Sequence, residues 1–370
     1  MSLFYKLIKS NTNDDLNIKL SLWGITIYKT YIKNGFIYKK WLLGLRWERT
    51  FKNVIEGLTQ RVKVAEPEVK NIWVLSNQSG ETSLLLVTIK EDRAVLNNTI
   101  FIATKPYHVQ LIEIFLPGAK YFYMPEYFGL HLKKDSQHSL FCKGVQVKIV
   151  QPLGYFIKYE QELQHDVCKS HFYHRYCQAT HILNKKTELK YPDIQEKDRN
   201  DIYKKLSNKG VRRPFVLISN ETWSNLNLSD AFYQKLSFEL SQEGYDVVFN
   251  SRVVSEANLY GHVIFLSLNE TIALAKEAAW VIGIRSGLMD VIYPYSDKMI
   301  VIYTAFRDRG KMFPELKASC VFKAFSLKQL PIKKDKNKYL KEIIFDTTLN
   351  QTEELLITEV ISCILVNDRG

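Results

Sequence analysis

The stretch WVIGIRSGLMDVIYPY, residues 280–295, sets a strand directly against a helix. Its first five residues, WVIGI, are apolar and favour a strand that is buried on both faces. After Ser286 the apolar side chains are spaced as in a helix. Arg285, Ser286 and Gly287 stand between the two elements. The stretch therefore predicts a strand–turn–helix unit of a parallel α/β sheet, with a fixed positive charge at the turn.

Similar apolar runs recur on both sides of this stretch. After residue 213 they are PFVLIS (214–219), DVVFN (246–250), HVIFLS (262–267) and KMIVIYT (298–304), with helices expected over 229–243 and 269–279. Earlier in the chain they are NIWVLS (from 71), NNTIFIAT (97–104), KYFYM (120–124) and VQVKIV (145–150), with helices expected at PYHVQLIEIF and over 155–183. Strands that are apolar on both faces and alternate with helices indicate parallel sheets covered on both sides. We therefore expect an α/β protein with two Rossmann-like domains.

A polar and charged segment, residues 184–213, separates the two halves and predicts a linker with a helical turn. The tail TEELLITEVISCILV has the spacing of an amphipathic helix that packs back on a domain. The expected division is a basic, aromatic β-ribbon at 1–60, an N-terminal α/β domain at 61–185, a linker at 186–213, a C-terminal α/β domain at 214–345 and a C-terminal helix at 346–370.

Length and composition exclude several classes of protein. The chain has 370 residues, of which 46% are hydrophobic and 24% charged, as expected of two globular domains and not of a disordered chain. It has no run of 18 apolar residues and no signal peptide at its start, so neither a membrane span nor secretion is expected. Five scattered cysteines without a CxxC pair indicate reduced thiols. The expected location is the cytoplasm, with peripheral attachment to the inner membrane as an alternative to a free state.

The N-terminal segment carries much of the positive charge. The net charge is +12, and residues 1–53 hold ten Lys and Arg, three Asp and Glu, and ten aromatic side chains. Within this segment LWGITIYKTY (22–31) resembles LLGLRWERTF (42–51), which predicts two strands of one ribbon. Basic and aromatic side chains together fit an anionic membrane surface, or a solvated ribbon that packs on the main body. Nucleic acid is not expected as a partner, because no nucleic-acid-binding motif accompanies the charge.

Four consecutive predicted strands of the second half end in small polar or basic residues. These ends are Ser219-Asn220-Glu221-Thr222, Asn250, Ser267 and Arg285-Ser286-Gly287. In a doubly wound sheet such ends share the edge where ligands bind. The turn at 285–287 fits a phosphate group, although a capped helix with a surface arginine explains the same residues, and Ser267 with Glu270 fits a capping box. Together the four ends predict a site for an anionic, hydroxyl-rich ligand.

This half of the chain resembles a known family. It is similar to the donor-binding half of bacterial GT-B glycosyltransferases. The resemblance lies in the order of PFVLI, SNET, a helix, EGYDVVFN and IFLSLNETIALAKEAAWVIGIRSGLMDVI. The resemblance is to the lipopolysaccharide and capsule type, near the heptosyltransferase (family 9-like) group, and it covers residues 214–304 well and 71–125 loosely. It implies a GT-B fold whose N-terminal domain binds the acceptor and whose C-terminal domain binds a nucleotide-sugar.

The resemblance also implies roles for individual residues. The implied donor-binding residues are Ser219, Asn220, Thr222, Asn250, Ser267, Leu268, Arg285, Ser286, Gly287 and Asp290. Of these, the turn at 285–287 would bind the phosphates, and Asp290 would steady the turn or touch the sugar. The residues after PFVLI would face the sugar-phosphate, and backbone groups of Ser267 and Leu268 would flank the base.

The first half supplies a candidate catalytic base. Heptosyltransferases carry a Gly-Asp pair after their first strand, and its acid is the base; here the matching place reads Ser79-Gly80-Glu81-Thr82. Glu81 would take that role with a side chain one methylene longer, so the acceptor hydroxyl would have to sit differently. An acid in the first turn of a helix is also favourable for the helix dipole alone.

Candidates for the acceptor site are Lys105, His108, His174 and Arg175. The last two lie in HFYHRY (171–176), which either lines the cleft between the domains or packs through its aromatic rings. Cys168, His171, His174 and Cys177 are each three residues apart, but on one straight helix the first and last would point to opposite sides, so a zinc site is not expected. No D-x-D motif ends a strand, which fits transfer without a metal or other cofactor.

Three function classes fit these observations. The favoured one is a metal-independent glycosyltransferase that moves a sugar from a nucleotide-sugar donor to a lipopolysaccharide, capsule or other glycan acceptor, free or lipid-linked. A nucleotide-sugar epimerase of the same fold would act on the free nucleotide-sugar and would not need the basic ribbon. A non-catalytic nucleotide-sugar-binding subunit would keep the fold with a decayed site.

Overall fold

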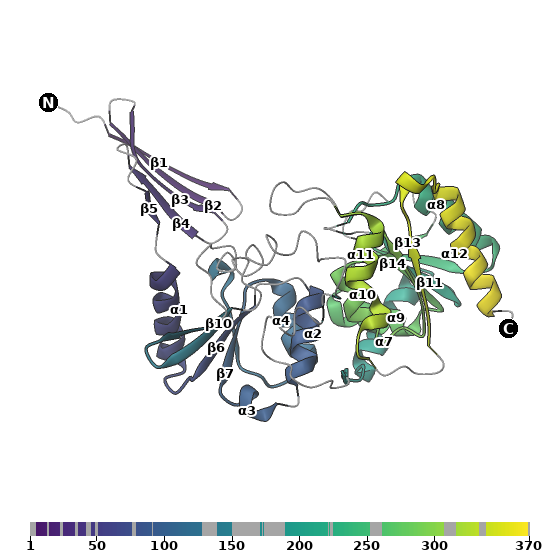
Figure 1. The fold of residues 1–370 in the computed structure, drawn as a ribbon, viewed down its shortest axis with the longest axis horizontal. Coiled ribbons are helices and arrows are strands. Elements are labelled where there is room, and N and C mark those ends of the chain that lie inside the picture. The colour runs from purple at the N-terminus through teal and green to yellow at the C-terminus, as the bar shows by residue number, and fades with distance from the viewer. Residues whose placement is uncertain are drawn as a thin grey trace. The chain divides into compact units, whose positions relative to one another are not determined.

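The chain forms two compact α/β units in a computed structural model (Figure 1). The first unit comprises Met1–Asn77 and Ile89–Gln161, and the second comprises Gln78–Thr88 and Glu162–Gly370. Each unit has a mainly parallel sheet, so the predicted fold class of two Rossmann-like units is confirmed. The structure describes residues 5–12, 15–22, 25–33, 36–41, 46–48, 51–75, 79–90, 92–127, 139–149, 171, 173, 189–220, 222, 225–251, 261–306, 316–332 and 338–368.

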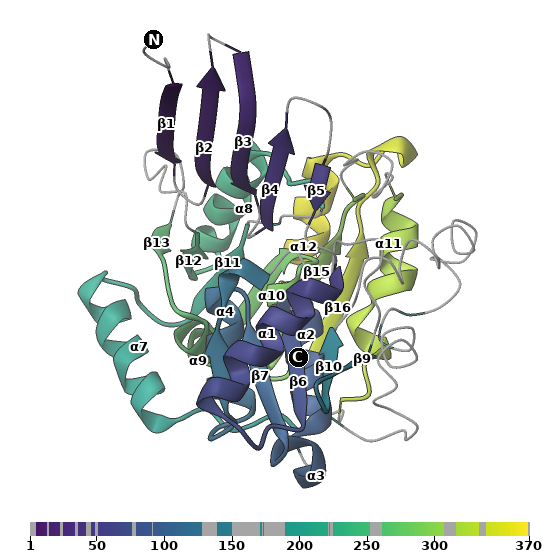
Figure 2. The ribbon, with the colours of Figure 1, turned by 90° about the vertical axis from the view of Figure 1, so that its left-hand side faces the viewer.

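The N-terminal segment forms an antiparallel sheet, which Figure 2 shows as adjacent arrows. Its strands, in spatial order, are β1 (Tyr5–Thr12), β2 (Asp15–Leu22), β3 (Ile25–Lys33), β4 (Phe36–Trp41) and β5 (Arg46–Glu48). The sequence predicts two strands here, within 22–31 and 42–51, whereas the structure has five. The strands end at Glu48 and helix α1 (Phe51–Ala65) follows, so the expected ribbon boundary at residue 60 falls inside a helix.

The first unit's main sheet has the order β8-β7-β6-β10-β9. Its strands are β6 (Asn71–Leu75), β7 (Thr99–Ala103), β8 (Tyr121–Tyr123), β9 (Ser139–Cys142) and β10 (Val145–Ile149). All neighbours are parallel except β9 and β10, which form a hairpin. The helices between these strands are α2 (Ser79–Ile89), α3 (Arg93–Leu96) and α4 (Pro106–Phe115). The sequence predicts each of these strands except β9, which alternates between exposed and half-buried residues and so lacks an apolar run.

Local sequence explains how α1 joins this sheet. Ile55, Leu58 and Val62 recur at intervals of three and four, lie on one face of α1 and are buried in one core with apolar residues of the strands. The β9–β10 hairpin turns at Lys143 and Gly144, whose φ angles of 50° and 77° suit a two-residue turn between twisted strands.

The second unit's sheet is parallel throughout, in the order β13-β12-β11-β14-β15-β16. Its strands are β11 (Phe215–Ser219), β12 (Asp246–Asn250), β13 (His262–Ile264), β14 (Trp280–Ile284), β15 (Lys298–Tyr303) and β16 (Tyr339–Ile344). In sequence order this is 3-2-1-4-5-6, the arrangement of doubly wound dinucleotide-binding sheets. The chain runs outward in one direction from β11 and in the other from β14, so the direction reverses between these two neighbours.

Helices of the second unit follow the predicted alternation. They are α7 (Glu196–Asn208), α8 (Asp230–Gln242), α9 (Leu268–Glu277), α10 (Gly287–Ile292), α11 (Ala318–Phe325) and α12 (Glu353–Asp368). Helix α12 is the predicted tail helix, and it packs beside α8 in this unit (Figure 1). Its apolar residues Leu356, Val360 and Ile364 join the core of the sheet. Glu353 at its start accepts a hydrogen bond from Ser229 N at 2.8 Å, which links the starts of α12 and α8.

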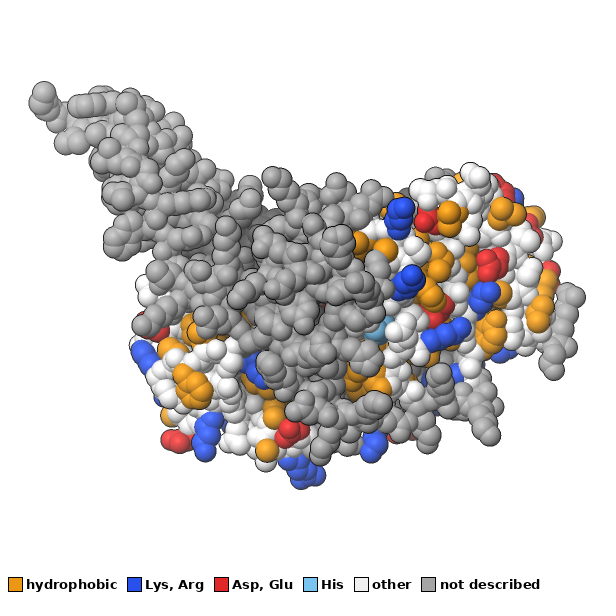
Figure 3. All heavy atoms as spheres, viewed as in Figure 1, with side chains coloured by type: hydrophobic (Ala, Val, Ile, Leu, Met, Phe, Trp, Pro, Cys, Tyr) orange, Lys and Arg blue, Asp and Glu red, His pale blue; other side chains and the backbone are white. Residues whose placement is uncertain are grey.

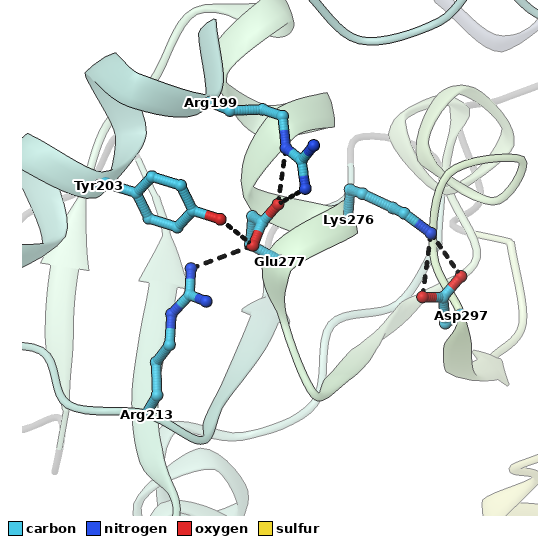
Figure 4. A network of polar contacts seen from close by, with 6 residues as sticks. All are labelled: Arg199, Tyr203, Arg213, Lys276, Glu277 and Asp297. Carbon is cyan, nitrogen blue, oxygen red and sulfur yellow. Dashed lines mark hydrogen bonds and ion pairs between the residues drawn. The ribbon is translucent and has the colours of Figure 1, made fainter. Parts of the chain in front are cut away.

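The predicted linker contains a full helix that is fastened to the second unit. Figure 4 shows the Glu277 carboxylate of α9 receiving hydrogen bonds from Arg199 and Tyr203 of α7 and from Arg213. Burial alone would raise the pKa of Glu277, but the bonds from Tyr203, Arg199 and Arg213 outweigh it and hold the pKa below its ordinary value. This segment is therefore an integral part of the unit and not a free connection.

Cys142 and Cys363 are free thiols, but Cys320 is disulfide-bonded, so the expectation of reduced thiols throughout is wrong. Of the helices in the described part of the chain, none has the length and apolar character needed to cross a bilayer. Figure 3 shows basic and acidic side chains interspersed among apolar ones on the visible face of the described residues. Residues 155–183, expected to be helical, lie outside the described residues except for 171 and 173.

Candidate functional site

The candidate site lies at the carboxyl ends of β11 and β14, the two neighbouring strands of the second unit between which the strand order reverses. Ser219 of β11 lies opposite Gly283 of β14 in parallel register. The carboxyl ends of both strands therefore lie side by side. The chain continues from β11 into Asn220 and from β14 into Arg285. Ligands of open α/β sheets bind outside this edge. Two of the segments predicted for the donor site are thus brought together.

The backbone at this edge is closely packed. A Cβ on Gly283 would lie 2.9 Å from Met289 Sδ and 3.0 Å from Ser219 O, so a larger residue would push β11 and α10 away from β14. Ser219 itself is buried. Next to it, Asn220 Oδ1 is buried and accepts no hydrogen bond from any described residue. Such an unpaired acceptor costs about 1–3 kcal/mol, which a ligand hydroxyl or amine would offset.

Arg285 is buried, unlike the surface arginine of the alternative interpretation. Its side chain is 7% exposed, and its Nη2 lies 2.8 Å from Asp290 Oδ1. Its Nε donates to Phe325 O at 3.1 Å, and the guanidinium carbon lies 5.3 Å from the centre of the Phe325 ring. Arg285 thus fastens the β14–α10 turn to the end of α11. Its charge lies directly beneath the turn, and its role in phosphate binding stays a prediction.

Asp290 is the buried partner of Arg285. It lies in the first turn of α10 and is 1% exposed. Its Oδ1 is close enough to Arg285 for an ion pair but receives no well-formed hydrogen bond from the described residues. Burial is the main cause that raises the pKa of Asp290 to about 7; Arg285 opposes the rise and Glu81 adds to it. The pair therefore has two accessible charge states near neutral pH, and the position of Asp290 fits a residue that steadies the turn.

The start of α2 packs directly against the start of α10, within the second unit. A Cβ on Gly287 would lie 2.7 Å from Ser79 Oγ and 2.9 Å from Gly80 N, and a Cβ on Gly80 would collide with Asp290 Oδ2. Because neither position has room for a side chain, the two glycines let the two turns touch through their backbones. The SGET and RSG motifs, which are far apart in the sequence, therefore form one junction.

Ser286 supplies an unsatisfied hydroxyl at this junction. It is the N-cap residue of α10, but its side chain makes no capping hydrogen bond. Its Oγ is buried and has no partner among the described residues. N-cap serines ordinarily accept a bond from the second or third N–H of their helix. Of the two roles predicted for Ser286, the capping role is therefore not realised.

Glu81 lies in the first turn of α2, beside the charge of Arg285. Its side chain is half-buried. Burial raises the pKa of Glu81, while its own backbone N–H and Arg285 partly oppose the rise. A carboxylate whose pKa is raised holds a proton more readily, which suits a base that works near neutral pH. The structure thus places the predicted base beside the predicted phosphate turn.

The remaining predicted donor-site residues are Thr222, Asn250, Ser267 and Leu268. Thr222 Oγ1 accepts from Asn225 N at 3.5 Å, and Asn250 Nδ2 donates to Thr271 Oγ1 at 3.1 Å. Ser267 forms the predicted capping box with Glu270. Leu268 is buried. These residues organise the loops at the sheet edge, and their contacts with a nucleotide stay predictions.

Two of the predicted acceptor residues, Lys105 and His108, lie together at the start of α4. Lys105 is half-buried at the start of α4. His108 is fully buried, and its Nδ1 accepts a hydrogen bond from Thr104 N at 3.2 Å. The acceptor-binding role of His108 stays a prediction. His174 and Arg175 lie outside the described residues.

Sequence reasoning missed several contributors to the site. Ser79 and Gly80 stand in the quoted motif but receive no role of their own, although a glycine directly after a strand could have indicated a close backbone contact. Phe325 holds Arg285 through its carbonyl and its ring. No local pattern marks Phe325, because it meets Arg285 only in the folded chain.

The described residues contain no group of three or more His, Cys, Asp or Glu side chains that could hold a metal ion. Of the Cys/His series, only His171 is described. Its Nε2 lies 2.9 Å from Ser326 O, and its Nδ1 accepts from Tyr173 N at 3.3 Å. His171 therefore contacts the segment that follows α11.

Comparison with known proteins finds likeness in structure. No family model and no curated protein sequence matches the chain. The solved structure of a glycosyl transferase family 9 protein from Veillonella parvula DSM 2008 is 12% identical, covers 80% of this chain and 98% of its own, and has a TM-score of 0.48. The ADP-heptose lps heptosyltransferase II of E. coli is 12% identical, covers 82% of this chain and 100% of its own, and has a TM-score of 0.48.

A third similar structure is the iron-containing dodecameric glycosyltransferase TibC from enterotoxigenic E. coli. It is 11% identical, covers 82% of this chain and 77% of its own, and has a TM-score of 0.41. All three proteins are glycosyltransferases, the class that the sequence resembles. At these identities and TM-scores they are too distant to assign a donor, an acceptor or a metal to this chain.

Proposed function

We propose that this chain is a GT-B glycosyltransferase that moves a sugar from a nucleotide-sugar to a hydroxyl group of a lipopolysaccharide, capsule or other glycan acceptor. The observation that carries the proposal is the junction of two strand-to-helix turns at the switch point of the second unit's sheet. One turn contributes Ser79-Gly80-Glu81 and the other Arg285-Ser286-Gly287. The sequence resemblance assigns a base to the first turn and phosphate binding to the second.

The diphosphate of the donor fits the polar groups of this junction. Ser286 Oγ can donate its proton to a phosphate oxygen, and it has no partner among the described residues. The start of α2, an eleven-residue helix, adds N–H groups and the positive end of a helix dipole. Arg285 adds a full positive charge from beneath. Asn220 Oδ1 can accept a hydrogen bond from a ribose or sugar hydroxyl.

Glu81 is the proposed general base. Its carboxylate takes the proton of the acceptor hydroxyl while the acceptor oxygen attacks the anomeric carbon of the sugar. The bond from that carbon to the phosphate oxygen breaks, and the nucleoside diphosphate leaves with the electron pair. Arg285 and the start of α2 stabilise the negative charge that the leaving diphosphate gains.

Transfer is proposed to need no metal ion or other cofactor. Positive charge is supplied at the leaving group by Arg285 and by the start of α2, which is the task that a metal performs in other transferases. Transfer rates should therefore be unchanged after dialysis against EDTA. A loss of activity that a divalent cation restores would show that the metal-independent part of the proposal is wrong.

A peripheral position at the inner membrane is proposed for an enzyme with a lipid-linked acceptor. The support is the charge of residues 1–53, which hold ten Lys and Arg against three Asp and Glu. Each basic residue near an anionic leaflet contributes about 1 kcal/mol. Co-sedimentation with liposomes should therefore require anionic lipid and weaken with salt. Equal binding to neutral liposomes, or none to either kind, would count against a membrane position.

The test of the proposed function is nucleotide release from a panel of nucleotide-sugars. Thermal stabilisation by each member first identifies the donor, because a ligand that binds the folded state raises its stability. Release of nucleoside diphosphate that depends on a glycan acceptor is the expected result. Interconversion of the donor's sugar without an acceptor would indicate an epimerase. Binding without turnover would indicate a non-catalytic subunit.

A further inference from the structure

Asp290 occupies the centre of the junction and faces charged groups from each turn. Its Oδ1 lies 2.8 Å from Arg285 Nη2, and its Oδ2 fills the space where a side chain at position 80 would begin. Both members of the pair are nearly inaccessible, with side-chain exposures of 7% for Arg285 and 2% for Asp290. Water therefore screens this pair much less than a surface pair.

The other titratable groups that act on Asp290 do not neutralise it. Glu81 of α2 brings a second carboxyl group, and the two acids raise the proton affinity of the junction. Tyr191, which precedes α7, is half-buried with a buried hydroxyl oxygen, and burial followed by the charge of Asp290 raises its pKa well above the ordinary value. Tyr191 is therefore a neutral phenol at physiological pH. With both acids ionised, the described charged groups that act on Asp290 are the negative charge of Glu81 and the positive charge of Arg285.

We propose that binding of a nucleoside diphosphate at this junction takes up one proton from solvent, and that the Asp290 carboxylate receives it. The inference rests on the proposed function, because it concerns the site assigned to the donor phosphates. Like charges in one poorly solvated site disfavour each other's ionised form. The arriving diphosphate would otherwise add its negative charge beside the two carboxylates of Asp290 and Glu81. Protonation of Asp290 removes one of these negative charges from the surroundings of Arg285 and the phosphate.

In the free protein Asp290 is mostly ionised at pH 8 and can therefore take up a proton. Burial raises the pKa of Asp290 to about 7, so at pH 8 about nine-tenths of the molecules hold the ionised form. The last phosphate proton of a nucleoside diphosphate is lost at a pKa of about 6, so the ligand itself is ionised there. Binding that raises the pKa of Asp290 further therefore takes up close to one proton at pH 8. At pH 6 the uptake falls towards zero, because Asp290 already carries its proton.

Isothermal titration calorimetry of the full-length protein measures this uptake. ADP, UDP, GDP and dTDP are titrated at pH 8 in buffers of different ionisation enthalpy, and the slope of observed enthalpy against ionisation enthalpy gives the number of protons bound. We expect a slope close to one for the nucleotide that binds. We also expect the dissociation constant to rise about tenfold per pH unit above pH 7 and to be level below it.

Two variants assign the proton. Asp290→Asn should bring the slope close to zero and make the dissociation constant independent of pH, whereas Glu81→Gln should keep the uptake. Proton uptake that persists in Asp290→Asn and disappears in Glu81→Gln would overturn the assignment to Asp290. If Asp290→Asn fails to fold, the parent and Glu81→Gln still decide, because loss of uptake in Glu81→Gln contradicts the proposal.

The calorimetry also separates this inference from the proposed function. Tight binding of one nucleotide by the parent with a slope of zero overturns proton coupling and leaves the donor-site assignment standing. Absence of binding by every nucleotide overturns both. A slope near one that Asp290→Asn abolishes supports both.

Discussion

Two acids of the second unit, the half-buried Glu277 and the buried Asp290, are each paired with arginine but differ in how many hydrogen bonds they receive. Glu277 receives four hydrogen bonds from three side chains, including Arg199 Nη2 at 2.7 Å and Arg213 Nη2 at 3.1 Å (Figure 4). Asp290 has a single arginine, and its Oδ1 receives no well-formed hydrogen bond from the described residues. Accordingly the pKa of Glu277 lies below its ordinary value and that of Asp290 is raised to about 7.

The difference indicates that Glu277 has a structural role, whereas Asp290 belongs to a candidate ligand site. A fully bonded carboxylate has no capacity for a ligand, so Glu277 serves to hold α7 on α9. The Asp290 junction combines a perturbed acid with the buried Ser286 Oγ, which, like Asn220 Oδ1 at the end of β11, has no hydrogen-bond partner among the described residues. Perturbed pKa values and unsatisfied buried groups are typical of functional sites.

The largest effect is expected for Glu81→Gln. The amide keeps the size of the side chain but cannot accept the proton of the acceptor, so kcat should fall by about 10²–10⁴-fold. Donor affinity should not fall, because the amide removes a negative charge from beside the phosphates, and thermal stability should change little. Steady-state kinetics with the identified donor and acceptor measure the loss. The matched control is Asp230→Asn, which removes an exposed first-turn acid of α8 and should leave kcat unchanged. Parent-like turnover by Glu81→Gln would mean that another group is the base.

Removing the Glu277 carboxylate, which holds α7 on α9, should lower the stability of the fold without changing nucleotide affinity. Glu277→Gln loses the charge on hydrogen bonds to two arginines, which should lower the free energy of unfolding by about 1.5–3 kcal/mol. Because the pKa of Glu277 is lowered in the folded state, the loss should be full at pH 7 and shrink as the pH falls through that lowered pKa. Urea unfolding at several pH values measures it. An equal loss of nucleotide affinity would show that the two clusters are not separate.

The contact between the two turns is tested by a single methyl group. Gly80→Ala places a Cβ against Asp290 Oδ2, and such overpacking costs about 1–3 kcal/mol. Nucleotide affinity should fall in parallel, because the start of α2 must move away from α10. The matched control is Gly57→Ala in α1, where the added Cβ meets nothing within 4 Å and the helix should be slightly stabilised. Calorimetry measures the nucleotide affinity of both variants, and thermal unfolding measures their stability. If Gly80→Ala behaves like its control, the turns do not touch in solution.

The remaining prediction is a change in the pH dependence of stability. The folded pKa of Asp290, about 7, lies above its unfolded value, so the folded state binds more protons between about pH 4 and 7. This residue therefore makes the free energy of unfolding fall as the pH rises through that window. Asp290→Asn lacks this contribution, and its stability relative to the parent should rise between pH 5 and 8. A constant difference across this range would mean that Asp290 has an ordinary pKa.

Much of the second unit follows from sequence pattern, because its strands are continuous apolar runs. DVVFN and WVIGI match β12 and β14 residue for residue. β16 was missed because Lys341 and Glu342 interrupt its apolar pattern. Strand order, which creates the switch point between β11 and β14, has no local signal. The same holds for the ion pair of Arg285 and Asp290, since tertiary packing alone decides whether an arginine after a strand is buried or exposed.

The most direct test of the central claim is a crystal structure of the protein with the nucleoside diphosphate identified by calorimetry. The claim is that the junction of the α2 start with the β14–α10 turn binds the donor phosphates. We predict a phosphate oxygen within hydrogen-bond distance, about 3 Å, of Ser286 Oγ, with Arg285 and Asp290 directly beneath it. A diphosphate bound elsewhere, with Ser286 Oγ and the start of α2 untouched, would contradict the claim.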